Sequence, residues 1–204
     1  MAASARLSRM NVILWLLTAY LCGSLPFSVW LGGLLLGKEI RHFGDGNPGG
    51  TNVIRAGSRA LGVTVIVLDG LKGYLPVLAA QRLGDLPDSA LAGAAVAAVA
   101  GHAFSIFLRF RGGKAVAVTF GIWAGLTGWS SLFVLGALLL LAYFTISIDG
   151  WAVIGAFCGL LVFLAVSGSP GAILPVWIGN GLILAWKHRL DLAQRPEIRL
   201  PFLQ

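Results

Sequence analysis

The chain alternates between long apolar runs and short polar connections. A helix needs about 20 apolar residues to cross the hydrocarbon core of a bilayer, and the first three runs are long enough. We expect helices at residues 10–37, 61–83, 89–108, 115–126, 131–148, 151–166 and 172–186. Several of the later runs are short and need not cross fully. The pattern therefore predicts an all-α integral membrane protein, a compact bundle of about seven transmembrane helices.

Composition agrees with this class. Of the 204 residues, 57% are hydrophobic and only 11% are charged, and the mean hydropathy is +0.86. A formal net charge of +7 could indicate a nucleic-acid partner, but the basic residues lie in the connections between apolar runs, so no nucleic acid is expected. Cys22 and Cys158 both lie inside apolar runs, without other ligands at useful spacing, and are interpreted as buried thiols. No metal or cofactor is expected.

The basic residues also predict the orientation. Of the 15 Lys and Arg residues, four lie in 38–59, three in 109–114 and four in 187–204. Positively charged loops stay on the cytoplasmic side, so with seven spans the N-terminus is outside and the C-terminus is cytoplasmic. We therefore expect one domain over residues 1–204, with an N-terminal tail at 1–9 and a cytoplasmic tail at 187–204.

The connection Arg41–Arg59 is the most polar and glycine-rich stretch of the chain. Its backbone N–H groups, with arginines nearby, could hold an anion such as phosphate. Glycine, asparagine and proline are also what ordinary loops contain, and composition alone favours that interpretation. A second basic connection, Arg109–Lys114, places two glycines before a lysine at the start of a predicted helix, although it lacks the P-loop spacing. Both loops and the histidine-bearing tail share one predicted face, which favours a functional site.

Two ionisable residues fall inside the second apolar run. Asp69 and Lys72 are three residues apart, so their side chains can pair on one helical face. Charges at membrane depth are costly and face the protein interior. We interpret this pair, and the lone His102 near the end of the third apolar run, as structural.

Five segments together carry a resemblance to a known family. They are AYLCGSLPF (19–27), GDGNPGGTNVIR (44–55), LDGLKGYLPV (68–77), GHAFSIFLRFRGGKAVAVT (101–119) and KHRLD (187–191). In this order they resemble the bacterial acyl-phosphate:glycerol-3-phosphate acyltransferases, the PlsY family. The resemblance covers about residues 20–195.

The resemblance implies an enzyme of the bacterial inner membrane with its active site on the cytoplasmic face. The implied reaction moves a fatty acyl group from acyl phosphate to the primary hydroxyl of glycerol 3-phosphate. The product is lysophosphatidic acid, the first step of phospholipid synthesis. The family is thought to let the donor's own phosphate take the hydroxyl proton, so the protein mainly positions both substrates. Membrane lipid is a further partner, and the oligomeric state is left open.

Site residues follow from the resemblance by position. Arg55 and Lys114 are expected to act on substrate phosphate, and His188 is the histidine of the C-terminal motif; these form the expected catalytic set. The expected substrate-binding residues are Gly44, Asp45, Gly46, Asn47, Gly49, Thr51, Asn52, Gly112, Gly113, Asp149 and Asp191.

Three of these positions depart from the family pattern. Asp45 replaces a serine of the family pattern, and Asp191 replaces an asparagine. Asp149 aligns with the first residue of a serine pair in the family. Acids beside a dianionic phosphate repel it unless they are protonated or paired. We expect the three to lie close together, and three hypotheses stay open. The family reaction could hold with the acids paired by local arginines, the acceptor could be less anionic, or the bundle could be a non-catalytic binding or transport protein.

Overall fold

The computed structural model describes residues 2–168 and 173–198, and most of these residues are helical. Their only extended pairing is one isolated bridge between Ile146 and Ile198. The helices are α1 (Ala2–Ser24), α2 (Phe27–Leu36), α3 (Gly50–Arg55), α4 (Arg59–Leu83), α5 (Asp88–Ala103), α6 (Val116–Thr127), α7 (Trp129–Thr145), α8 (Asp149–Val166), α9 (Ile173–Lys187) and α10 (Arg189–Leu192), with short 3₁₀ turns η1 (Ile40–His42) and η2 (Ile106–Leu108).

Four helical stretches in the described part of the chain are long and apolar enough to cross a membrane. They are Arg9–Leu36, Arg59–Leu83, Asp88–Leu108 and Asp149–Val166. Three further apolar helices, Val116–Thr127, Trp129–Thr145 and Ile173–Lys187, are shorter. The all-α prediction is therefore confirmed, whereas the count of seven spans and the orientation of the termini stay predictions.

The first predicted helix is two helices. Pro26 has no backbone N–H, so α1 ends at Ser24 and α2 starts afresh at Phe27. The carbonyl of Leu25, freed by this break, accepts a hydrogen bond of 2.6 Å from Lys72 Nζ on α4. At the other end, α1 begins at Ala2, so the expected N-terminal tail is helical from that residue onward.

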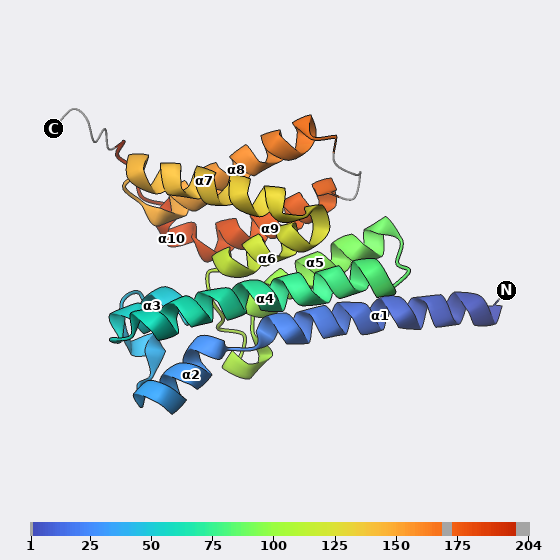
Figure 1. Cartoon of the computed structure of the whole chain (residues 1–204), viewed down its shortest axis with the longest axis horizontal. Helices are drawn as coiled ribbons and strands as arrows, with labels where there is room; N and C mark the ends of the chain where they lie inside the picture. Colours follow the sequence, from blue (N-terminus) through green and yellow to red (C-terminus); the bar gives the residue numbers. More distant parts are fainter. Residues whose placement is uncertain (1, 169–172, 199–204) are drawn as a thin grey trace.

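Small residues allow the helices to approach closely. α1 packs on α5, α4 on α6 and α7 on α8. A Cβ on Gly73 of α4 would lie 2.7 Å from the carbonyl oxygen of Val118 in α6, and one on Gly101 of α5 would overlap the carbonyl of Tyr20 in α1. Figure 1 shows α2, α3 and α10 at one end of this bundle, opposite to the start of α1. The glycine-rich loop within Arg41–Arg59, called the glycine loop below, and the C-terminal motif at 187–191 are distant in sequence. They thus reach the same end of the helical bundle.

Candidate active site

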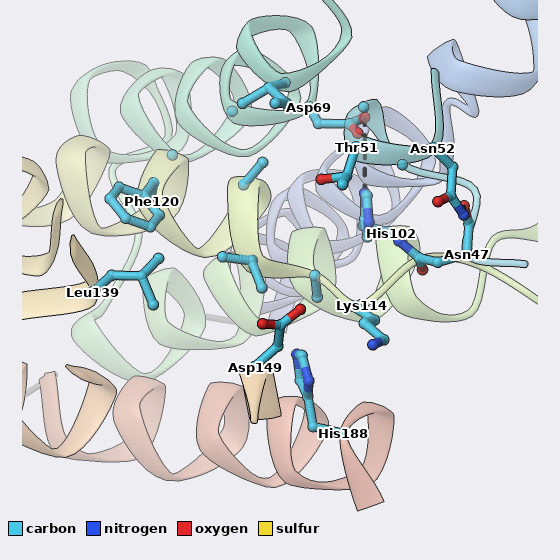
Figure 2. Close-up of a pocket in the computed structure, with 18 of the residues that line it drawn as sticks. Asn47, Thr51, Asn52, Asp69, His102, Lys114, Phe120, Leu139, Asp149 and His188 are labelled. Carbon is cyan, nitrogen blue, oxygen red and sulfur yellow. Dashed lines mark hydrogen bonds and ion pairs between the residues drawn. The ribbon is translucent and has the colours of Figure 1, made fainter. Parts of the chain in front are cut away.

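A cavity of about 960 Å³ opens where these two segments meet. Its polar wall comes from the loop before α3, from α3 itself, from the segment before α6, from the start of α8, and from His188 and α10. Its apolar wall comes from α4, α6 and α7. Figure 2 shows Lys114, Asp149 and His188 converging, with Phe120 and Leu139 to one side. The expected residues that line it are Asp45, Asn47, Gly49, Thr51, Asn52, Arg55, Lys114, Asp149, His188 and Asp191.

The glycine loop is a hydrogen-bonded unit that presents Arg55 to the cavity. Asp45 Oδ1 accepts from the backbone N–H of Asn47 at 3.2 Å and from Asn52 Nδ2 at 2.9 Å. Arg55 Nη1 donates to Asn52 Oδ1 at 2.9 Å. Gly44 has a φ of +57°, and a Cβ there would overlap both Arg55 and Asn52. Glycine is therefore required at this turn for both its conformation and its size.

Gly46, like Gly44, has a positive φ angle. Its φ is +73°, in the left-handed region that glycine adopts readily. Gly44 and Gly46 shape the loop without lining the cavity, so the expectation that they contact substrate is not supported. Gly49 caps the N-terminus of α3, and Thr51 in its first turn lines the cavity.

Lys114 is held between two of the three unexpected acids. Its Nζ lies 3.0 Å from Asp45 Oδ2 and 3.3 Å from Asp191 Oδ2. Burial alone would raise the pKa of Asp45, but hydrogen bonds from Lys114, Asn52 and Asn47 outweigh it and hold the pKa below its ordinary value. Burial likewise opposes the charge on Lys114, but Asp45 and Asp191 outweigh it and raise the lysine pKa. The expectation that arginines pair these acids is wrong, because a lysine does so.

His188 packs against the charged cluster of Lys114, Asp45 and Asp191 through its contact with Asp191. Its Nδ1 lies 3.2 Å from Asp191 Oδ2, and the residue is 2% exposed. Burial lowers the pKa of His188, Lys114 lowers it further, and Asp191 and Asp149 act in the opposite direction. A Cβ on Gly150 would approach the Cβ atoms of both Asp191 and His188. Glycine after Asp149 thus lets the C-terminal motif dock against the start of α8, and the three acids share one site as expected.

The expected phosphate cradle at Gly112 and Gly113 stays a prediction that the structure does not support. Neither glycine lines the cavity, and one backbone group of each is already hydrogen-bonded. The N–H of Gly113 donates to His102 O at 3.0 Å, and the carbonyl of Gly112 accepts from Lys187 Nζ at 2.7 Å. A Cβ on either glycine would overlap His102. Both glycines therefore anchor the segment against α5 so that Lys114 projects into the cavity.

Asp69 and His102 line the cavity, although only a structural role was expected for them from the sequence. The expected pair is confirmed, with Lys72 Nζ 2.7 Å from Asp69 Oδ1 and both side chains 5% exposed. His102 Nδ1 lies 3.9 Å from the same carboxylate oxygen (Figure 2). Tyr143 near the end of α7 and Ser147 just after this helix also line the cavity, and neither was expected from the sequence. A charged pair inside an apolar run was the available signal for an interior polar site.

Known proteins with similar sequences show which family the chain belongs to. The family model for glycerol-3-phosphate acyltransferase matches residues 13–195. The glycerol-3-phosphate acyltransferase of Aromatoleum aromaticum is 42% identical over 184 residues, covering 88% of this chain and 90% of that protein. The enzyme of the same name from Syntrophotalea carbinolica is 38% identical over 184 residues, covering 87% and 90%.

Solved structures agree with the sequence comparisons. The crystal structure of PlsY, an integral membrane glycerol 3-phosphate acyltransferase, in its glycerol 3-phosphate form has a TM-score of 0.76 and 31% identity, covering 89% of this chain and 90% of that one. The lysophosphatidic acid form gives a TM-score of 0.77 at 29% identity, with the same coverage. The family indicated by the five sequence segments is thereby confirmed. The chain belongs to the glycerol-3-phosphate acyltransferase family.

Proposed function

We propose that the protein transfers a fatty acyl group from acyl phosphate to the primary hydroxyl of glycerol 3-phosphate, giving lysophosphatidic acid in the first step of phospholipid synthesis. The observation that carries this is one cavity that joins a polar end, where Arg55 and Lys114 lie beside Asp45, Asp149 and Asp191, to an apolar wall. One end offers Arg55 and Lys114 to phosphate, and the other offers α4, α6 and α7 to a lipid chain. The family membership supports the same acceptor.

The apolar wall suits a fatty acyl chain. Along α7 it runs from Tyr143, beside the polar cluster, to Trp129, and 14 residues of helix span about 21 Å. The aromatic rings of Trp129 and Tyr74 lie 5.6 Å apart at the far end. A chain that entered between α6 and α7 would place its carboxyl carbon near Lys114. Acyl phosphate is already a mixed anhydride, so the acceptor oxygen can attack this carbon without a covalent acyl-enzyme.

We propose the membrane arrangement expected from the sequence. The protein would be a single domain of seven spans in the bacterial inner membrane, with the N-terminus outside and the active site on the cytoplasmic face. The basic connections and α10 gather at one end of the bundle, which supports this orientation (Figure 1). A water-soluble substrate would enter from that side and the lipid donor from the bilayer.

A second candidate differs only in the acceptor. Asp45 and Asp191 both form ion pairs with Lys114 and offset its positive charge. An alcohol that carries less negative charge than glycerol 3-phosphate could therefore be the acceptor. Purified protein in detergent, given labelled acyl phosphate and a panel of acceptors, would separate the two. The proposed reaction requires labelled lysophosphatidic acid, whereas a product formed only with uncharged alcohols would contradict it.

Single substitutions would test the phosphate contacts. Lys114→Ala and Arg55→Ala should each lower kcat/KM by roughly tenfold to more than a hundredfold, the range for losing a hydrogen bond to a charged group. Arg41→Ala is a matched control, because Arg41 lies in the same loop but pairs with Glu39 at 2.7 Å, away from the cavity. Folded Lys114 and Arg55 variants with unchanged turnover would show that these side chains do not hold substrate.

A further inference from the structure

Lys187, the last residue of α9, connects two segments that lie far from it in the sequence. Its Nζ donates a hydrogen bond of 2.7 Å to the carbonyl oxygen of Gly112 and one of 3.1 Å to that of Ala103. Ala103 ends α5, so its carbonyl has no partner within the helix and lies at the negative end of the helix dipole. Nζ also lies 5.6 Å from the centre of the Phe104 ring. Lys187 therefore fastens the end of α9 to the end of α5 and to the segment before α6.

The segment before α6 needs such an anchor because two glycines precede Lys114. Glycine leaves a backbone more conformational freedom than any other residue. The N–H of Gly113 donates to His102 O at 3.0 Å. The carbonyl of Gly112 accepts from Lys187, so each glycine is fixed by one hydrogen bond. Removing the second bond would free the backbone two residues before Lys114.

Among the described residues, two polar contacts join the C-terminal motif to this segment. One is the ion pair of 3.3 Å between Lys114 Nζ and Asp191 Oδ2, and the other is the hydrogen bond from Lys187 to Gly112. A phosphate bound to Lys114 competes with Asp191 for the same ammonium, so the first contact weakens when substrate enters. The second contact uses a backbone carbonyl outside the cavity, and substrate leaves it in place. Lys187 can therefore hold the segment throughout turnover.

We propose that Lys187 is a positioning residue of the active site: by binding the carbonyl of Gly112, it sets the place at which the ammonium of Lys114 meets substrate phosphate. This role rests on the proposed acyl transfer and deepens it. Lys187 is not among the described residues that line the cavity, and its Nζ is already directed at two carbonyls. These two facts disfavour the alternative that Lys187 is itself a phosphate ligand.

A double-mutant cycle would test whether Lys187 acts through Lys114. Lys187→Met keeps the apolar stem beside Phe104 but cannot donate a hydrogen bond. It should lower kcat/KM for glycerol 3-phosphate by about tenfold to a hundredfold, the cost of misplacing a binding group by about 1 Å. The same change made in Lys114→Ala should lower kcat/KM by less than about twofold, because the group that it positions is already gone. A side chain that only stabilised the bundle would cause equal losses in both backgrounds.

Chemical restoration of the ammonium gives a second test. In a background with Cys22→Ala and Cys158→Ala, Lys187→Cys should lose about as much activity as Lys187→Met. Alkylation of the new thiol with 2-bromoethylamine then forms a lysine analogue in which sulfur replaces one methylene. Most of the activity should return with the ammonium, measured against the same background with Lys187 intact. Mass spectrometry would establish that the modification is complete.

Arg189→Met is the matched control. Arg189 is another cation of the same motif, but it donates to the carbonyl of Trp186 at 2.9 Å and lies 4.8 Å from the centre of that ring. None of its hydrogen bonds within the described chain reaches the segment before α6. Its removal should leave kcat/KM unchanged, whereas a loss equal to that of Lys187→Met would show a general effect of charge in this motif and would overturn the proposal.

The remaining outcomes separate this inference from the proposed function. If wild type acylates glycerol 3-phosphate, and Lys187→Met keeps its kcat/KM or loses it equally in both backgrounds, only this inference fails. It also fails if the fully alkylated protein stays inactive. If wild type forms no ester with any acceptor, the proposed function fails and the inference fails with it. Circular dichroism and gel filtration would identify a misfolded Lys187→Met, and the alkylation of folded Lys187→Cys would then decide.

Discussion

Asp45 is the position at which one substitution should strengthen substrate binding. Its Oδ2 lies 3.0 Å from Lys114 Nζ, where a phosphate oxygen would otherwise bind. Asn at this position keeps an oxygen for the N–H of Asn47 and for Asn52, so the loop should retain its shape. The substitution therefore removes a negative charge from the lysine while leaving the hydrogen bonds that present Arg55.

The size of the effect follows from the geometry. Two oxygens that both contact one ammonium at about 3 Å can be at most about 6 Å apart. At that separation, and with the dielectric constant of water, a dianionic phosphate is repelled by Asp45 by about 1.4 kcal/mol. This corresponds to about tenfold in affinity. We expect Asp45→Asn to lower KM for glycerol 3-phosphate by about this factor, with a smaller change in kcat.

Initial rates at fixed acyl phosphate and varied glycerol 3-phosphate would measure the change. Glu39→Gln is the control, because it removes one carboxylate near the same loop but outside the cavity. Arg41 holds the pKa of Glu39 at about 2, so this control also removes a group that is ionised at neutral pH. Equal shifts in both variants would show a general surface-charge effect. A higher KM in Asp45→Asn would refute the repulsion argument and show that Asp45 helps to bind the acceptor.

Three further predictions concern stability, chain length and topology. Asp69→Asn leaves the buried charge of Lys72 without an opposite charge, so it should lower the free energy of unfolding by about 3–5 kcal/mol, measured by denaturation in detergent. The double change Asp69→Leu with Lys72→Met should recover most of this loss. Trp129→Ala opens the far end of the apolar wall, so kcat/KM across a series of acyl phosphates should shift toward longer chains, and an unchanged series would place the acyl chain elsewhere. Cysteines at Ser58 and Gln194 should resist membrane-impermeant labels added outside intact cells, and external labelling at either site would contradict the cytoplasmic orientation.

Much of the fold could be predicted because helix formation in a membrane protein depends on local sequence. A run of apolar residues must satisfy its own backbone hydrogen bonds, so the helix positions follow from the hydropathy pattern. The Asp69–Lys72 pair was also predictable, since its spacing of three is a property of one helix. The family motifs located Arg55, Lys114 and His188, and all three line the cavity.

The tertiary structure decided which groups in these motifs meet. Lys114 and Asp191 are 77 residues apart, and only the docking of α10 against the start of α8 brings them together. The sequence could not show that a lysine, rather than an arginine, pairs the acids, because several cations lay within the same loops. Nor could it show that Gly112 and Gly113 pack on His102, since a glycine beside a lysine has the same sequence pattern in a phosphate loop and in a tight helix contact. Such contacts depend on the distances between helices, and these are set by the close packing of the whole bundle.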